Sequence, residues 1–275
     1  MWIVPVAICF VVVAIYLFLV FPAKPKKEDY TKFSKRSYAH RGFHDNEEGP
    51  SENVVEAFAK ATELKYGIEL DVQLTKDKKV VVFHDSDLKR TSGLDSKVLD
   101  VEYEELKNIK VFDRENIPLF SEVLKNIGND IPLIVEIKSE GGREWVNETC
   151  RLTYDLLKDF EGIYCIESFD PFAVGWFKKN APEVVRGQLA SSRESYKGSV
   201  KPFTAFLLHN LFLNCIGRPH FIAYDHEANC FNLILCRLFG SMIVRWTIKS
   251  KERHDELQAK SDGLIFEGYE PKNIW

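Results

Sequence analysis

The chain has 275 residues, of which 45% are hydrophobic, so it can bury one large core. Lengths near 250 residues are common for a single α/β barrel, and this length does not require two domains. The formal net charge of −4 excludes broad nucleic-acid binding, which needs a basic face. No nucleic-acid partner is therefore expected.

The first segment of the chain is strongly apolar. Residues 2–21 contain no charged side chain and are almost entirely aliphatic or aromatic. Twenty helical residues at about 1.5 Å each match a hydrocarbon core about 30 Å thick, which predicts a transmembrane anchor over 1–22. The alternative is a cleaved signal peptide. A signal peptide needs a basic start and a shorter apolar core, and Met1 and Trp2 supply no basic side chain.

A short basic linker, residues 23–36, follows the anchor. Nothing basic precedes the apolar segment, whereas the linker contains Lys24, Lys26, Lys27, Lys32, Lys35 and Arg36. Basic residues favour the cytoplasmic side of a membrane. The sequence therefore predicts a single-pass protein of the cell membrane with its C-terminal domain in the cytoplasm.

Strand-like and helix-like segments alternate after the linker. Alternation over about 240 residues indicates a parallel α/β fold, and the count favours an irregular TIM (β/α)8 barrel over 37–275. Strands are expected at 37–42, 67–73, 80–85, 132–138, 163–169, 185–190, 221–227, 242–248 and 263–268. Helices are expected at 52–65, 119–128, 143–159, 171–180, 202–215, 230–239 and 250–259.

Nine predicted strands exceed the eight of a barrel, so one is either a false prediction or an added hairpin. The link between 67–73 and 80–85 is too short for a helix, which predicts an irregular barrel at that point. Residues 86–118 are polar without a clear period. They predict a small insertion over the barrel mouth.

Two pairs of charged residues stand at alternate positions on predicted strands. Side chains at i and i+2 of a strand point to the same side, so Glu69 and Asp71 share one face of an apolar strand. Two such carboxylates are costly without a cation, and a hard divalent ion prefers oxygen ligands. The alternative is a solvated strand end. Glu136 and Lys138 repeat the spacing with opposite charges, which a structural ion pair also explains, but Glu136 can be a third ligand and Lys138 can meet a phosphate.

Two histidines, His40 and His84, end strand-like segments. A single histidine near a strand end is usually structural, but two near carboxylates can serve as a proton acceptor and a proton donor. Arg41 offers a planar fork of donors for phosphate oxygens, and Gly42 permits close approach of the backbone.

A series of motifs follows in order along the chain: His40-Arg41-Gly42, Ser51-Glu52-Asn53 with Ala57-Phe58, Glu69-x-Asp71-Val72, Val82-x-His84-Asp85 with Leu88-x-Arg90-Thr91, Glu136-x-Lys138, Ser168-Phe169 and Trp246-Thr247. With these motifs, residues 37–268 strongly resemble the glycerophosphodiester phosphodiesterase family. The resemblance implies an irregular TIM barrel of the phospholipase-C-like phosphodiesterase type. It also implies hydrolysis of glycerophosphodiesters to glycerol 3-phosphate and an alcohol.

The resemblance also implies roles for individual residues. Glu69, Asp71 and Glu136 would hold one Mg²⁺ or Ca²⁺ ion, and His40 and His84 would form the acid/base pair. Substrate contacts would come from Arg41, Lys138, Glu52 and Trp246. In the implied mechanism a substrate hydroxyl beside the phosphate attacks phosphorus, and water then opens the resulting cyclic phosphate.

The sequence departs from the family pattern in three places. Ser51 stands where a proline is common, and a serine suits the start of a helix. Residues 246–249 read Trp-Thr-Ile-Lys in place of the usual Trp-Thr-Val-Asn. Residues 263–268 read Gly-Leu-Ile-Phe-Glu-Gly in place of Gly-Ile-Ile-Thr-Asp, so the acidic group is kept as Glu267 or lost, depending on register. These departures concern substrate choice more than chemistry.

Residues 203–216 are more apolar than an outer barrel helix needs, and residues 231–239 form a second apolar segment. Both are too short to span a bilayer; 203–216 is either an ordinary packing helix or a helix in the membrane surface. Membrane contact would favour a lipid or lysolipid diester over a small soluble diester. A second interpretation is therefore a phospholipase or lysophospholipase with the same site. A third, of another class, is a catalytically silent, membrane-tethered phosphate-binding protein.

Overall fold

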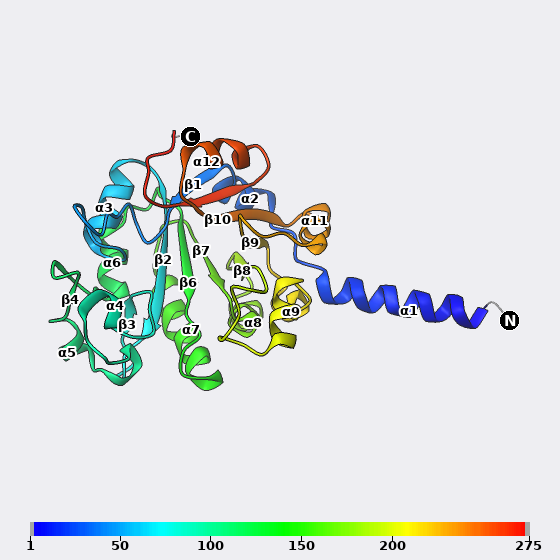
Figure 1. The fold of residues 1–275 in the computed structure, drawn as a ribbon, viewed down its shortest axis with the longest axis horizontal. Helices are drawn as coiled ribbons and strands as arrows, with labels where there is room; N and C mark the ends of the chain where they lie inside the picture. Colours follow the sequence, from blue (N-terminus) through cyan, green and yellow to red (C-terminus); the bar gives the residue numbers. More distant parts are fainter. Residues whose placement is uncertain (1–2, 273–275) are drawn as a thin grey trace.

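The computed structural model describes residues 3–272, and its central feature is a closed barrel (Figure 1). Eight parallel strands of these residues form the ring in the order β1, β11, β10, β9, β8, β7, β6, β2, and β1 pairs with β2 to close it. The predicted TIM barrel is confirmed. The strands are β1 (Arg36–Ala39), β2 (Gly67–Leu74), β6 (Leu133–Ile137), β7 (Tyr164–Ser168), β8 (Arg186–Ala190), β9 (Phe221–Asp225), β10 (Met242–Ile248) and β11 (Gly263–Phe266).

Helices surround the barrel and connect successive strands. They pack on the outer face of strands whose residues are almost all buried on both sides, as expected of a parallel sheet covered by helices. The connecting helices are α3 (Val55–Glu63), α6 (Phe120–Asn126), α7 (Arg143–Leu157), α8 (Pro171–Asn180), α9 (Pro202–His209), α10 (Asn214–Gly217), α11 (Phe231–Leu238) and α12 (Lys251–Gln258).

The barrel is irregular at the predicted place. β3 (Val80–Val82) lies outside the ring and pairs antiparallel with β2, so the ninth predicted strand is an added hairpin. The insertion that follows contains α4 (Lys89–Ser92), η1 (Val98–Asp100), α5 (Tyr103–Leu106), β4 (Lys110–Val111) and β5 (Glu115–Asn116). It has its own small core, in which Leu106 and Ile117 pack in one cluster with Phe83. This core holds the segment that carries His84 against the barrel.

Aromatic side chains fill the interior of the barrel near the amino ends of its strands. The rings of Tyr38 and Phe221 occupy the space that side chains at two glycines would need. A Cβ at Gly67 would lie 2.4 Å from Cδ1 of Tyr38, and one at Gly187 would lie 2.2 Å from ring atoms of Phe221. The interior is therefore a packed apolar floor. Polar side chains gather above it, at the carboxyl ends of the strands.

The N-terminal helix α1 (Ile3–Val20) projects away from the barrel (Figure 1). Only its end is fixed: Val20 is fully buried, and Arg218 Nη1 donates to the Phe18 carbonyl at 2.8 Å. Most of its other large side chains are exposed. Within residues 3–272, no helix has both the length and the apolar character required to cross a membrane. The predicted transmembrane helix is therefore not supported.

Two predicted helix boundaries need correction. The helix expected at 52–65 begins later, at Val55, because Asn53 adopts a left-handed conformation with φ of 59°. Ser51 does not cap this helix; its Oγ donates to Glu115 Oε2 at 2.6 Å and ties the insertion to the barrel. The helix expected at 202–215 is divided into α9 and α10, with Leu211 at φ of 58° between them. Part of the predicted linker is also folded, since α2 (Lys27–Phe33) buries Phe33 beneath the barrel.

Candidate active site

The carboxyl ends of the strands surround a cavity of about 440 Å³. A second, more open cavity of about 710 Å³ adjoins it and shares His84, Arg90 and Glu136 with it. Seven of the nine predicted site residues line one or both cavities: His40, Arg41, Glu69, His84, Glu136, Lys138 and Trp246. Asp71 and Glu52 lie directly behind this lining, in contact with Lys138 and Arg41 respectively. The structure thus brings together all the residues that the sequence singled out.

Three buried carboxylates form the base of the cavity. Glu69 and Asp71 lie on β2, and the sheet register places Asp71 beside Glu136 on β6. One oxygen of each lies within 4.8 Å of the others. Lys138 Nζ lies 2.7 Å from Asp71 Oδ1 and 2.8 Å from Glu136 Oε1, while Glu69 accepts from the backbone N–H of Arg41 at 3.0 Å. The oxygens are therefore close enough to bind one ion together.

The pKa shifts of the three carboxylates indicate that their negative charge exceeds the positive charge of the neighbouring side chains. Burial, together with the neighbouring carboxylates, raises the pKa of Glu69 well above its usual range, and burial raises that of Glu136. Burial would also raise the pKa of Asp71, but the charges of Lys138, His84 and Arg41 hold it well below its usual range. Three oxygen ligands with excess negative charge fit a hard divalent cation such as Mg²⁺ or Ca²⁺. The residues present thus fit the predicted cofactor.

Arg41 reaches the cavity through an uncommon backbone conformation, with φ of 54°. Its Nη1 donates to Glu52 Oε1 at 2.7 Å, and its Nε lies 3.6 Å from Asp71 Oδ2. Arg90, from the insertion, donates two hydrogen bonds to the same Glu52, at 2.9 and 2.6 Å. Glu52 therefore lies between two guanidinium groups and holds both of them; its predicted contact with substrate stays a prediction.

Each predicted catalytic histidine is paired with a carboxylate through Nδ1. His84 Nδ1 lies 2.6 Å from Asp85 Oδ1, and His40 Nδ1 lies 2.5 Å from Glu267 Oε2. His40 Nε2 is 4.0 Å from Glu69 Oε2, beside the carboxylate cluster. Burial lowers the pKa of His40 to about 4 although Glu267 opposes this shift, so its ring is neutral near pH 7. In both pairs Nε2 is the nitrogen left for a substrate.

Trp246 forms part of an apolar wall. It lies near the end of β10, and its ring meets that of Phe169 edge-on, with ring centroids 5.6 Å apart. Both rings line the smaller cavity. Phe169 follows Ser168, whose buried Oγ donates to the Ile137 carbonyl at 2.7 Å and fixes this turn. An apolar wall opposite charged groups suits a substrate with a polar head and a carbon skeleton.

Sequence reasoning missed several residues of this site. Glu167 on β7 is 1% exposed, lines the smaller cavity, and stands beside Glu136 in the sheet register. Burial and the charges of Glu136 and Asp71 raise its pKa well above its usual range. In the sequence, Glu167 could have been recognised as a single acidic residue within a predicted, mostly apolar strand. Arg90, Asp85 and Lys249 were visible only as parts of motifs or as departures from them.

The sequence matches the model of the glycerophosphoryl diester phosphodiesterase family over residues 40–264. The chain belongs to this family. It is an enzyme of the phosphoric diester hydrolase class, and the predicted resemblance is confirmed.

Three similar proteins illustrate the range of the match. A glycerophosphodiester phosphodiesterase of Caldanaerobacter subterraneus is 32% identical over 82% of this chain and 91% of its own. A phosphodiesterase of Oleispira antarctica, solved in complex with the product sn-glycerol-3-phosphate, shares the fold with a TM-score of 0.69; it is 22% identical over 86% of this chain and 94% of its own. A lysophospholipase D of Rattus norvegicus is 34% identical over 44% of this chain and 38% of its own.

Proposed function

We propose that this phosphodiesterase hydrolyses glycerophosphodiesters to sn-glycerol 3-phosphate and an alcohol, with the help of one divalent cation. The observation that carries the proposal is the convergence of three buried carboxylates, two cationic side chains and two histidine–carboxylate pairs on one cavity. The product bound by the Oleispira antarctica relative supports the glycerol-phosphate half of the substrate. The two histidine pairs argue against a catalytically silent phosphate-binding protein.

Binding rests on opposite charges. Glu69, Asp71 and Glu136 would hold the Mg²⁺ or Ca²⁺ ion, which when bound supplies a Lewis acid that stabilises negative charge on the phosphoryl oxygens. Arg41 and Lys138 would contact the remaining phosphate oxygens through charge-assisted hydrogen bonds. Both are held in place before substrate arrives, Arg41 by Glu52 and Lys138 by Asp71. Such preorganisation favours the charged transition state.

The reaction would proceed in two balanced steps. In the first, Nε2 of His40 accepts the proton of the glycerol hydroxyl beside the phosphate, the hydroxyl oxygen bonds to phosphorus, and the bond from phosphorus to the alcohol oxygen breaks. His84 donates a proton to that leaving oxygen. In the second, His84 accepts a proton from water as it attacks the cyclic phosphate, and His40 returns its proton to the glycerol oxygen. We assign His40 to the glycerol side because its ring lies beside Glu69, whereas His84 borders the open cavity.

The test is turnover of glycerophosphocholine by the full chain, with release of glycerol 3-phosphate and choline measured. Chelation with EDTA is expected to abolish turnover, and addition of Mg²⁺ or Ca²⁺ to restore it, which also identifies the ion. A matched thermal-unfolding measurement should show that the same ion raises the melting temperature of the wild type but not of Asp71→Asn. Full turnover in EDTA would contradict the role of the cation. Absence of turnover on any glycerophosphodiester would contradict the function.

A lysolipid is the second candidate substrate. The relative described as a lysophospholipase D supports it, as does an apolar surface on α9 and α11, where Phe203, Phe231 and Leu238 are 71%, 67% and 75% exposed. A panel that compares lysophosphatidylcholine and phosphatidylglycerol with glycerophosphocholine separates the alternatives. A higher kcat/KM for the lysolipid would favour the lysophospholipase interpretation, and cleavage of intact phosphatidylglycerol would favour a phospholipase.

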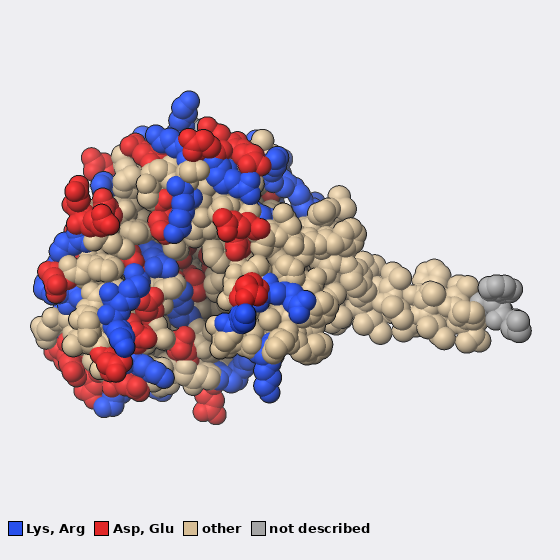
Figure 2. Space-filling view, in the orientation of Figure 1, with Lys and Arg blue, Asp and Glu red and all other residues tan. Residues whose placement is uncertain are grey.

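We also infer that α1 tethers the barrel to a membrane by inserting its apolar side chains. In Figure 2 charged side chains cover the barrel, while α1 and the adjoining surface carry few. The exposed side chains of α1 include Phe10, Val12 and Phe18, at 74%, 60% and 59% exposure. The α9 segment within 203–216 would contact the same membrane surface. The cytoplasmic position of the barrel stays a prediction.

Membrane fractionation with a carbonate wash tests this inference. The wild type is expected in the pellet, and Val12→Asp together with Phe10→Asp should move the protein to the supernatant with its turnover of glycerophosphocholine retained. A wild type that is washed off the membrane would contradict the tether.

A further inference from the structure

Two departures from the family sequence pattern meet in the structure. Lys249 replaces the usual asparagine after Trp246-Thr247, and Glu267 stands in the last acidic position. Lys249 follows the end of β10 and Glu267 follows the end of β11, which are neighbouring strands. Lys249 Nζ lies 3.1 Å from Glu267 Oε1. Lys249 and Glu267 are therefore partners in one ion pair.

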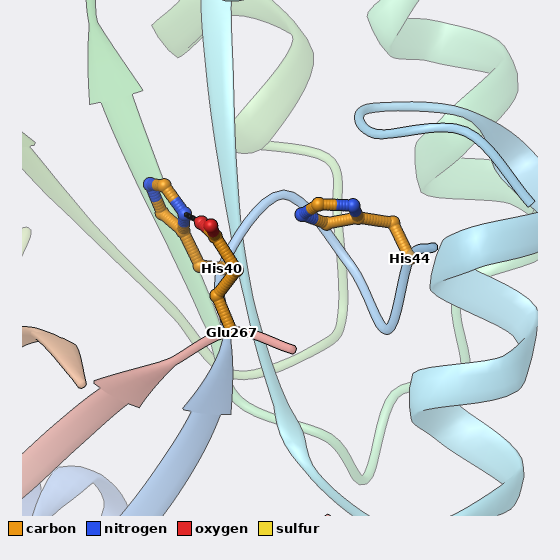
Figure 3. A group of neighbouring side chains, drawn as sticks. All are labelled: His40, His44 and Glu267. Carbon is orange, nitrogen blue, oxygen red and sulfur yellow. Dashed lines mark hydrogen bonds and ion pairs between the residues drawn. The ribbon is translucent and has the colours of Figure 1, made fainter. Parts of the chain in front are cut away.

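The other oxygen of Glu267 reaches His40. Glu267 Oε2 lies 2.5 Å from His40 Nδ1, and the carboxylate points directly at the ring in Figure 3. This contact joins the carboxyl ends of β1 and β11, which are neighbouring strands of the barrel. The side chains of His40 and Glu267 are only 16% and 23% exposed, so water competes little for the hydrogen bond.

The group in Figure 3 is a histidine–carboxylate pair rather than a metal site. Two ligands of one zinc ion each lie about 2.0–2.2 Å from it, which holds the ligand atoms about 3 Å or more apart. At 2.5 Å, His40 Nδ1 and Glu267 Oε2 leave no room for an ion between them. His44 stands apart from the pair in the figure, and neither of its ring nitrogens has a hydrogen-bond partner in the described structure.

We propose that Glu267, held in turn by Lys249, is the positioning residue that fixes the tautomer and orientation of His40. The Nδ1–H of His40 donates to Glu267, and Nε2 is left bare and directed to the substrate hydroxyl. The catalytic consequence rests on the proposed function; the orientation of the ring does not. Neither Glu267 nor Lys249 touches the reacting atoms.

The same arrangement on the other side of the cavity supports this proposal. His84 Nδ1 is paired with Asp85 Oδ1, and Asp85 Oδ2 accepts from Arg90 Nε at 2.6 Å. The site therefore contains two relays, each a histidine, a carboxylate and a cation: the His84 relay (His84, Asp85, Arg90) and the His40 relay (His40, Glu267, Lys249). A carboxylate that accepts from Nδ1 of a histidine sets which ring nitrogen carries the proton.

Substitutions of Glu267 test the proposal in the full chain. Glu267→Ala removes the acceptor, and kcat for glycerophosphocholine should fall by about 10- to 100-fold, the usual effect of losing the partner that orients a histidine, with KM unchanged. Glu267→Asp keeps a carboxylate that can accept from both His40 and Lys249, restores the acidic residue usual in the family, and should recover most of kcat. A residue of equal charge that lies away from the relay, Glu256, supplies the control Glu256→Ala, which should leave both constants unchanged.

A second readout does not depend on turnover. Long-range ¹H–¹⁵N NMR of the histidine-labelled protein, assigned with His40→Gln, should show His40 protonated at Nδ1 in the wild type and in Glu267→Asp, and a mixture of tautomers in Glu267→Ala. An unchanged kcat or an unchanged tautomer in Glu267→Ala would overturn the proposal, as would a loss confined to KM. If the wild type hydrolysed no glycerophosphodiester, the proposed function would fail, and the tautomer measurement would still decide the role of Glu267.

Discussion

The two histidine relays have the same chemistry but different construction. The His84 relay comes from seven consecutive positions of the chain, 84–90, and its cation, Arg90, is also fixed by two hydrogen bonds to the buried Glu52. The His40 relay is assembled from the ends of β1, β10 and β11, and its cation, Lys249, is 70% exposed with one ion-pair contact to Glu267. The His84 relay is therefore held by one local segment of the chain, whereas the His40 relay depends on closure of the barrel.

This difference has a consequence for function. A cation with one exposed contact contributes little, because water and salt screen its charge. A guanidinium that is held through several of its N–H donors keeps its position. It also loses less side-chain entropy for each hydrogen bond that it forms. The His84 relay should therefore be the more rigid of the two. The His40 relay should respond more to ionic strength, and less to replacement of its outermost residue, Lys249.

The largest expected effect comes from removing either histidine. His40→Ala and His84→Ala should each lower kcat for glycerophosphocholine by about 10²- to 10⁴-fold, the usual contribution of a general acid or base. His226, which accepts from Arg253 away from the cavity, provides the control His226→Gln with unchanged kcat. Wild-type turnover in either alanine variant would refute the acid/base assignment and, with it, the comparison of the relays.

The next effect concerns the two carboxylates. Asp85→Ala should lower kcat at least as much as Glu267→Ala, within about 10- to 100-fold, because it also frees Arg90 from the segment that carries His84. Steady-state kinetics of the two variants side by side are the measurement. A clearly smaller loss of kcat in Asp85→Ala than in Glu267→Ala would mean that catalysis depends less on the His84 relay than on the His40 relay.

Much of this architecture could be predicted from the sequence, and the two relays show where prediction stops. The alternation of strands and helices identified the barrel, and the spacing Glu69-x-Asp71 placed two carboxylates on one face because side chains of a strand alternate. Asp85, next to His84, stood in a predicted motif. Glu267 could not be paired with His40, because contacts between residues 227 positions apart depend on the order of strands in the closed sheet.

Local conformation set a second limit. Ser51-Glu52-Asn53 resembled a helix start, but the left-handed conformation of Asn53 delays the helix and turns the Asn53 side chain to Asp71, where Nδ2 donates to Oδ2 at 2.7 Å. Glu52 thereby meets two arginines that are 11 and 38 positions away along the chain. Such conformations are rare for residues other than glycine, and helix propensity alone does not predict them.

A third prediction concerns Glu52, which supports Arg90 and so the His84 relay. Burial alone would raise the pKa of Glu52, but the hydrogen bonds and charges of Arg90 and Arg41 outweigh it and lower the pKa to about 2. Because the folded pKa is depressed, the stability that Glu52 contributes is present above about pH 4.5 and is lost as the pH falls through about 2. Urea unfolding should find Glu52→Gln less stable than the wild type at pH 7, and the difference should shrink at pH 3. A difference that does not change with pH would mean that the ion pairs do not stabilise the fold.

The smallest effect should come from the two cations, and it distinguishes the relays most directly. Lys249→Asn, which restores the usual family residue, removes one exposed ion pair of about 0–1 kcal/mol, so kcat should fall by no more than about fivefold at low salt and the loss should disappear at high salt. Arg90→Lys removes the fork that binds the buried Glu52, so its loss should be larger and should persist at high salt. The measurement is kcat of both variants and the wild type across ionic strength. Equal losses with equal salt dependence would show that the two relays are held alike, because only a screened, single contact at Lys249 makes the His40 relay the weaker one.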